Sequence, residues 1–138
     1  MPLSCRHGNR GQAVPEKILV VEDNEQNRIL MRQILTHHGY DVLEAPDGLT
    51  GLEMARRHLP AMILLDIQMP VMNGYAVIRE LRHDPKLEKI KVIAVTSFAM
   101  RGDKEKALQG GFDEYVTKPI DTRKFPELVE QVLARMQP

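Results

Sequence analysis

From Lys17 onward the chain alternates short apolar runs with longer segments in which apolar residues recur at helical spacing. This alternation is typical of βαβ units, in which parallel strands form one sheet and helices cover both of its faces. Three of the runs are almost continuously apolar, as strands buried on both faces should be. The sequence therefore predicts an α/β domain with five strands. These are Lys17 to Val21, Asp41 to Glu44, Met62 to Leu65, Lys91 to Val95 and Glu114 to Val116.

The segments between these runs have the apolar period of helices that face a core. Gly39 and the pair Gly110-Gly111 stand where helices should end, because glycine tolerates the left-handed conformation of a C-terminal cap. Pro126 is acceptable only near a helix start, so the last helix should be regular from about Phe125. The residues assigned to the core faces are Leu30, Met31, Ile34, Leu35, Leu52, Ala55, Leu59, Gly74, Val77, Ile78, Leu81, Leu128, Val129, Val132, Leu133 and Met136.

A length of 138 residues allows one compact domain with a hydrophobic core. Residues 1–15 lack the apolar run of a signal peptide, and we expect them to form a flexible tail before a folded domain of residues 16–138. No run approaches the roughly 18 apolar residues that cross a bilayer. Lys plus Arg equals Asp plus Glu at 19 each, so no basic excess favours nucleic acid. With a single cysteine, Cys5, the chain is expected to be cytoplasmic, without direct binding to membrane or nucleic acid.

Polar residues follow four of the predicted strands. Glu22 and Asp23 come after the first strand, Asp66 after the third, Thr96 after the fourth and Lys118 after the fifth. In an open parallel sheet the carboxyl ends of the strands form the ligand crevice at a topological switch point, so these residues should converge. Three carboxylates in one pocket must take up protons, pair with cations or bind a metal ion. All-oxygen ligands suit Mg2+, with Mn2+ as the alternative.

Each of these residues also has an ordinary structural explanation. Glu22 and Asp23 precede a helix whose free N–H groups they can cap. Asp66 can begin a turn, Lys118 can be a solvated lysine before a turn proline, and Thr96 can be a β-former that closes a strand. None of these explanations predicts that all five residues share one edge of the sheet. Their joint placement favours a functional site.

Four motifs carry a family resemblance in a fixed order. They are VVEDN at Val20 to Asn24, LLDIQMPVMNG at Leu64 to Gly74, AVTS at Ala94 to Ser97 and YVTKP at Tyr115 to Pro119. Together they resemble the receiver domain of two-component response regulators of the single-domain chemotaxis and cell-cycle kind, over essentially residues 16–136. The resemblance implies a flavodoxin-like, doubly wound fold, with a five-stranded parallel sheet in the order 2-1-3-4-5 and five flanking helices.

The resemblance also implies roles for the polar residues. Asp66 would be the phosphoacceptor, taking a phosphoryl group from a histidine kinase or a histidine phosphotransfer protein. Asp23, Asp66 and the backbone carbonyl of Gln68 would ligate Mg2+ directly, and Glu22 would do so through water. Lys118 would bind the phosphoryl group. Such a domain is not an enzyme in its own right, although it assists its own phosphorylation and dephosphorylation.

By the same resemblance, Thr96 and Tyr115 form a switch pair. The Thr96 hydroxyl would turn toward the phosphoryl oxygens, and the Tyr115 ring would move inward to fill the vacated space. The Lys118-Pro119 peptide bond is expected to be cis, an isomer that proline makes accessible. The signal would then pass to a downstream protein through the surface of the fourth helix, fifth strand and fifth helix.

Two further residues, Gln68 and Phe98, flank the expected phosphorylation pocket and are expected to influence the lifetime of the phosphate. A phenyl ring makes no conventional hydrogen bond to a hydrolytic water, so Phe98 predicts a long-lived phosphoaspartate. The run from Ser97 to Met100 is apolar for a loop. It is compatible equally with a docking surface and with packing onto the neighbouring helix.

Three alternative functions make different demands on the sequence. An aspartyl-nucleophile phosphatase of the haloacid-dehalogenase kind normally has a second Asp two positions after its nucleophile, where this chain has Gln68. A binding module that keeps only the fold should lack some of the acidic or lysine positions, and all are present here. A receiver domain excised from a hybrid histidine kinase stays open. The chain ends after the predicted fifth helix, which leaves protein contact as the expected output.

Overall fold

A computed structural model describes residues 15–97 and 101–135 of the protein. The predicted tail, except Pro15, lies outside the described residues, as do Phe98, Ala99, Met100 and Met136. Within the described part, none of the helices is both long enough and apolar enough to cross a membrane.

The centre of the molecule is one sheet of five parallel strands in the order β3-β2-β4-β5-β6. This is the predicted 2-1-3-4-5 order, so the flavodoxin-like fold is confirmed. The chain passes from β2 outward to β3 and then returns to β4 on the other side of β2, which puts the topological switch point between β2 and β4. The strands are β2 (Lys17–Val21), β3 (Asp41–Ala45), β4 (Met62–Asp66), β5 (Lys91–Thr96) and β6 (Glu114–Thr117).

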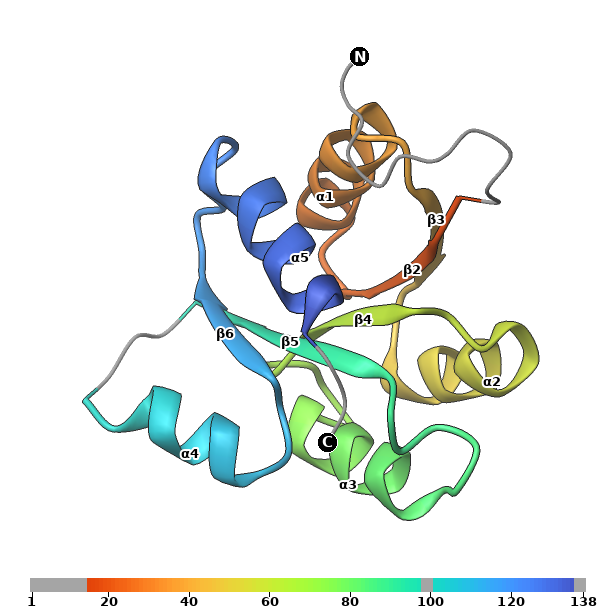
Figure 1. The fold of residues 1–138 in the computed structure, drawn as a ribbon. Coiled ribbons are helices and arrows are strands. Elements are labelled where there is room, and N and C mark those ends of the chain that lie inside the picture. The colour runs from red at the N-terminus through yellow and green to blue at the C-terminus, as the bar shows by residue number, and fades with distance from the viewer. Residues whose placement is uncertain (1–14, 98–100, 136–138) are drawn as a thin grey trace.

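Five helices cover the sheet, with α1 and α5 on one face and α2, α3 and α4 on the other (Figure 1). Successive residues of a strand point to opposite faces, so each strand contributes to both cores. In β2, Leu19 and Val21 pack toward α2 and α3, whereas Ile18 and Val20 pack toward α1 and α5. The helices are α1 (Glu25–His37), α2 (Gly48–His58), α3 (Gly74–His83), α4 (Asp103–Gln109) and α5 (Lys124–Ala134).

Short polar side chains start the first three helices. Asn24 Oδ1 accepts from the Asn27 N–H at 2.9 Å, and Asp47 and Asn73 cap α2 and α3 in the same way. A side-chain oxygen at this position satisfies an N–H that has no partner within the helix. The side chain that caps α1 is therefore Asn24, and not Glu22 or Asp23.

Helix ends agree with most of the predictions. α1 and α4 end just before Gly39 and Gly110-Gly111, and Gly39 and Gly111 have left-handed φ values of 91° and 112°. Pro126 is the third residue of α5, within the first turn, where no intrahelical acceptor is available for an N–H. The helix begins one residue earlier than predicted.

The prediction that Leu59 faces the core is wrong. α2 ends at His58, and Leu59 is its C-cap, with φ 48° and ψ 61°. This left-handed conformation turns the side chain away from the helix stripe, and 55% of the residue is exposed.

The predicted strands are confirmed, but β3, β4, β5 and β6 each extend one residue further than expected. Two of these additions matter for function, because Asp66 and Thr96 are the last residues of β4 and β5 and not the first residues of loops. Asp66 is paired with Val95 in the sheet. Both polar side chains are therefore buried at the sheet edge.

Candidate functional site

An acidic cluster lies at the carboxyl ends of β2 and β4, at the switch point of the sheet. Glu22, Asp23 and Asp66 each offer a carboxylate oxygen, and these three oxygens lie within 4.8 Å of one another. Glu22 is fully buried, Asp66 is only 3% exposed, and Asp23 is exposed. Two of the three negative groups are thus held out of water, and the third faces the solvent from which a cation would enter.

The start of α3 sits directly against the end of β4. A Cβ atom added to Gly74 would lie 2.7 Å from the Ile67 Cα atom and 2.9 Å from the Asp66 carbonyl oxygen. Gly74 N–H donates to the Ile67 carbonyl at 3.0 Å. Glycine is therefore required where the loop after Asp66 turns back, and this close approach holds the Asp66 backbone in place.

Lys118 brings a positive charge to the cluster. Its Nζ lies 2.9 Å from Glu22 Oε1 and 3.5 Å from Asp66 Oδ2, and its side chain is largely buried. Although the ammonium is close, Glu22 Oε1 accepts no well-directed hydrogen bond from the described residues. Lys118 thus contacts two of the three carboxylates, and in the described part of the chain a buried oxygen is left for another positive or hydrogen-bonding group.

The donor set fits a hard divalent cation. All the ligands are oxygen atoms, without sulfur or imidazole, which suits Mg2+. The protein supplies few of them, and Mg2+ prefers sites in which it keeps several water molecules. The buried Oε1 of Glu22, without a donor aligned on it, is an atom that a water of a hydrated cation would satisfy. The chemistry of the cluster therefore agrees with the sequence-based expectation of a metal site.

The protonation of Asp66 depends on the same surroundings. Burial, the Glu22 charge and a hydrogen bond with the Glu22 side chain raise the pKa of Asp66 from 3.8 to about 7. Lys118 and the Gln68 backbone N–H favour the charged form and act in the opposite direction. Without a metal ion, Asp66 therefore keeps its proton to a higher pH than an ordinary aspartate does.

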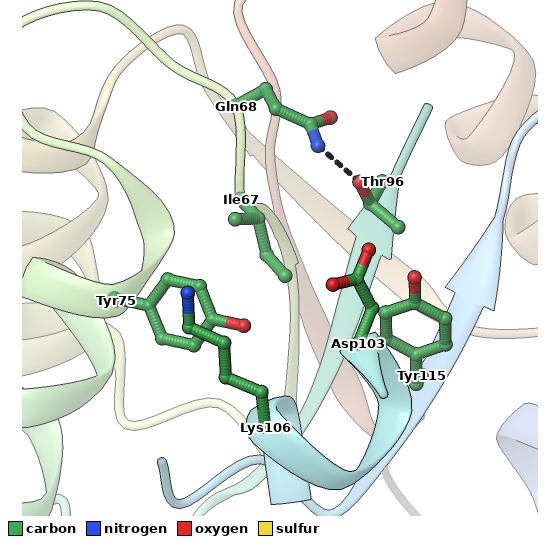
Figure 2. A pocket seen from close by; sticks show the side chains of 7 residues that line it. All are labelled: Ile67, Gln68, Tyr75, Thr96, Asp103, Lys106 and Tyr115. Atoms are coloured by element: carbon green, nitrogen blue, oxygen red, sulfur yellow. Dashed lines mark hydrogen bonds between the residues drawn. The ribbon is translucent and has the colours of Figure 1, made fainter. Parts of the chain in front are cut away.

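Gln68 links this cluster to the end of β5. Its backbone N–H donates to Asp66 Oδ1 at 3.0 Å. Its side-chain amide donates to Thr96 Oγ1 and accepts from the Ser97 N–H at 2.9 Å (Figure 2). On the other side of β5, the Lys118 N–H donates to the Thr96 carbonyl at 2.7 Å. Thr96 is thus held between the loop that follows β4 and the end of β6.

A cavity of about 230 Å3 adjoins Thr96. Figure 2 shows Tyr115 beside Asp103 on one side of it and Tyr75 with Lys106 on the other. The cavity is lined by Ile67, Gln68, Tyr75, Thr96, Asp103, Lys106 and Tyr115. Burial, and secondarily the Asp103 charge, raise the pKa of both tyrosines above its ordinary value.

The structure brings together most of the predicted site residues. Glu22, Asp23, Asp66 and Lys118 form one cluster, Gln68 connects Asp66 to Thr96, and Tyr115 lies across the adjoining cavity. The Lys118-Pro119 peptide bond is cis, the isomer implied by the resemblance. Phe98 and the rest of the apolar run after Ser97 lie outside the described residues.

Four lining residues of the cavity, Ile67, Tyr75, Asp103 and Lys106, were not singled out from the sequence. Asp103 and Lys106 are three positions apart on α4 and so share one face of that helix. Lys106 Nζ lies 5.2 Å from the centre of the Tyr75 ring, which comes from α3. The helical spacing pairs the two charged residues, but no local pattern indicates that this face meets Tyr75.

Comparison with known proteins agrees with this geometry. A family model described as the response regulator receiver domain matches residues 18–130. The polar-differentiation response regulator DivK of Brucella anthropi is 42% identical over 120 residues, which cover 87% of this chain and 98% of that protein. DivK of Brucella ovis is 42% identical over 118 residues, covering 86% of this chain and 96% of that protein.

Solved structures show the same fold. One is the receiver domain of a sensor histidine kinase from Pseudomonas aeruginosa with a magnesium ion coordinated in its active-site cleft. That domain is 31% identical to this chain, with a TM-score of 0.81, and the match covers 88% of this chain and 100% of that one. The chemotaxis protein CheY4 of Vibrio cholerae, at 24% identity and a TM-score of 0.81, covers 86% of this chain and 99% of that chain, and supports the fold alone. The chain belongs to the response regulator receiver domain family.

Proposed function

We propose that this domain is a phosphoacceptor of a two-component system and that Asp66 receives the phosphoryl group. The observation that carries the proposal is the convergence of Glu22, Asp23 and Asp66 at the switch point, with their oxygens within 4.8 Å. Receiver domains are signalling domains that interact with histidine kinases and downstream effectors, and this chain belongs to that family.

In the proposed reaction, an Asp66 carboxylate oxygen attacks the phosphorus of a partner's phosphohistidine. An O–P bond forms and the P–N bond breaks, and the electron pair returns to the imidazole nitrogen, which then takes up a proton. Attack requires the ionised carboxylate, whereas the raised pKa of Asp66 favours the protonated form when no cation is present. With a pKa of about 7, a substantial share of Asp66 is protonated at neutral pH, and a bound divalent cation would lower that pKa and increase the ionised, reactive share.

The proposed ligands of Mg2+ are Asp23 and Asp66 directly, the Gln68 backbone carbonyl, and Glu22 through a water molecule. When bound, the ion supplies positive charge for the oxygens of the transferred group, and Mn2+ has the same ligand preference. Lys118 supplies a second positive charge, with its Nζ 3.5 Å from Asp66 Oδ2. Loss of Lys118 is expected to weaken phosphorylation and its readout.

Thr96 and Tyr115 are proposed to read the phosphorylation. Thr96 ends the strand next to the one that carries Asp66, and Thr96 and Tyr115 both line the adjoining cavity. A hydroxyl that turns toward the new phosphoryl oxygens leaves space into which an aromatic ring can move. The surface of α4, β6 and α5, to which Tyr115 belongs, is the proposed site for a downstream protein.

The proposed donors are a histidine kinase or a histidine phosphotransfer protein, in the cytoplasm. Both a stand-alone regulator and the receiver part of a hybrid histidine kinase use the same site. The match to DivK over nearly all of that protein's length supports the stand-alone form. A phosphotransfer profile against the histidine kinases of the source organism separates these possibilities and identifies the donor.

The decisive experiment is incubation with a small phosphodonor and Mg2+, followed by intact mass measurement. We expect one added phosphoryl group on the wild-type protein, none on Asp66→Asn, and none after removal of divalent cations. Absence of an adduct on the wild type, or its persistence in Asp66→Asn, contradicts the proposal. Many turnovers of phosphate release from a phosphomonoester would instead support the aspartyl-nucleophile phosphatase.

A further inference from the structure

We propose that the Gln68 side chain is a positioning residue that holds Thr96 in its unphosphorylated arrangement and thereby makes phosphorylation-dependent switching harder. The inference rests on the proposed function of Asp66 as phosphoacceptor, and it gives Gln68 a role besides its backbone carbonyl. It concerns the equilibrium between two arrangements of the domain, whereas the expected effect of Gln68 on phosphate lifetime concerns a hydrolysis rate.

Three contacts place Gln68 between the two sites. The backbone N–H donates to Asp66 Oδ1 at 3.0 Å, the side-chain amide donates to Thr96 Oγ1, and the side-chain carbonyl accepts from the Ser97 N–H at 2.9 Å. The partners of the side chain are 28 and 29 positions away in the sequence, on a different strand end. One side chain thus connects the loop after Asp66 to both a side chain and the backbone at the end of β5 (Figure 2).

These contacts belong to one arrangement of the domain. Thr96 is buried, and its hydroxyl oxygen is the acceptor of the Gln68 amide. In the proposed switch, Thr96 turns toward phosphoryl oxygens on Asp66, and the Thr96 oxygen moves away from that amide. A bond that exists in only one of two arrangements shifts the equilibrium by its own net free energy.

The magnitude should be modest and measurable. A single hydrogen bond contributes roughly a three- to tenfold factor to an equilibrium after exchange with water is counted. Gln68 and Ser97 are both exposed, so their mutual bond contributes little to the switching equilibrium, although it protects the Ser97 N–H from exchange while it is formed. The bond to the buried Thr96 hydroxyl should therefore account for most of the effect.

Gln68→Met is the suitable variant, because it keeps the length of the side chain and the backbone carbonyl but removes both side-chain hydrogen bonds. Gln33→Met is the matched control, since Gln33 is exposed on α1 and touches none of the site residues named above. Gln68→Asn is a second variant, which keeps the amide but is shorter by one methylene and should not span the distance to β5.

The first measurement is amide hydrogen exchange at Ser97 by NMR, in the free protein without phosphodonor or metal. We expect exchange about three- to tenfold faster in Gln68→Met than in wild type or Gln33→Met. Unchanged Ser97 exchange would overturn the proposal whether or not Asp66 is phosphorylated. This arm therefore tests the Gln68 contacts independently of the proposed function.

The second measurement is the affinity for beryllofluoride, a phosphoryl analogue, at saturating Mg2+. Affinity should be about three- to tenfold tighter in Gln68→Met, intermediate or equally tight in Gln68→Asn, and unchanged in Gln33→Met. Equal or weaker binding by Gln68→Met, with wild-type thermal stability, contradicts the proposal. If the wild type itself does not bind beryllofluoride while Ser97 exchange responds as expected, it is the proposed function of Asp66 that fails.

Discussion

The Lys118 ammonium lies 2.9 Å from Oε1 of Glu22, a carboxylate that is fully buried at the end of β2. A buried ion pair gains little over an apolar pair, but the removal of one member leaves an uncompensated charge in the interior. Lys118 comes from the other edge of the sheet, after β6. Its ammonium group therefore offsets part of the negative charge of the buried Glu22 and Asp66 carboxylates.

Lys118→Met should therefore destabilise the metal-free protein at pH 8, by roughly 1–3 kcal/mol, because two buried carboxylates lose their cation. The free energy of unfolding in urea measures this effect. Lys104→Met is the control, since Lys104 forms an ion pair with Glu114 at 3.7 Å on the surface and should cost less than about 0.5 kcal/mol. Similar losses in the two variants would show that the Lys118 pair has no special weight.

Asp66→Asn should stabilise the metal-free protein, and by an amount that depends on pH. The pKa of Asp66 rises from 3.8 to about 7 on folding. The folded state binds the Asp66 proton more tightly than the unfolded state does. The free energy of unfolding is therefore highest, as far as Asp66 is concerned, below pH 3.8, and it falls as the pH rises toward 7. Asn resembles the protonated carboxyl group and does not titrate.

The variant should be more stable than wild type by roughly 1–3 kcal/mol at pH 8, and nearly equal to it at pH 4. Urea unfolding at a series of pH values measures the difference. A stability gain that is the same at pH 4 and pH 8 would contradict the raised pKa.

Mg2+ should raise the unfolding temperature of the wild type, because an ion that binds only the folded state stabilises it by mass action. Asp23→Asn removes one proposed direct ligand and should abolish most of that shift at the same Mg2+ concentration. Glu53→Gln removes an exposed negative charge from α2, outside the cluster, and should keep the full shift. Equal Mg2+ responses in the two variants would place the ion elsewhere.

Val71, in the loop between β4 and α3, is fully exposed and has a φ of 67°. This left-handed conformation is unfavourable for a β-branched residue, by roughly 1–2 kcal/mol, and glycine relieves it at some cost in chain entropy. Val71→Gly should therefore stabilise the protein by about 0.5–1 kcal/mol. Val71→Ala shortens the side chain but keeps a Cβ atom. It should change the free energy of unfolding by only about 0.3 kcal/mol. Equal effects of the two substitutions on urea unfolding would exclude backbone strain as the cause.

Phe98→Glu should shorten the lifetime of the phosphorylated protein. A carboxylate at this position offers an acceptor that can orient a hydrolytic water, which a phenyl ring does not. The measurement is the decay of the phosphorylated mass after the phosphodonor is removed. Phe98→Leu, which stays apolar, is the control, and an unchanged decay rate in Phe98→Glu would refute this explanation of the lifetime.

Much of the fold follows from the sequence because its signals are local. The apolar runs that became β2, β4 and β5, and the glycines after α1 and α4, are read from neighbours a few positions apart. The ends of parallel strands meet at one edge of a sheet, so the convergence of Glu22, Asp23 and Asp66 could also be anticipated. Leu59 shows the limit of such patterns, because its helical spacing is correct but the helix ends one residue before it.

The connections between the acidic cluster and the rest of the domain depend on how the elements pack together. The relative placement of separate loops brings Lys118 closer to Glu22 than to Asp66. It also lets the Gln68 side chain reach Thr96 and Ser97, and Asn24, not Glu22 or Asp23, caps α1. The raised pKa of Asp66 and the cavity beside Thr96 likewise arise from residues far apart in the chain. Local spacing specifies which face a residue takes within its own element, whereas burial, charge and hydrogen bonding between elements exist only after they have packed together.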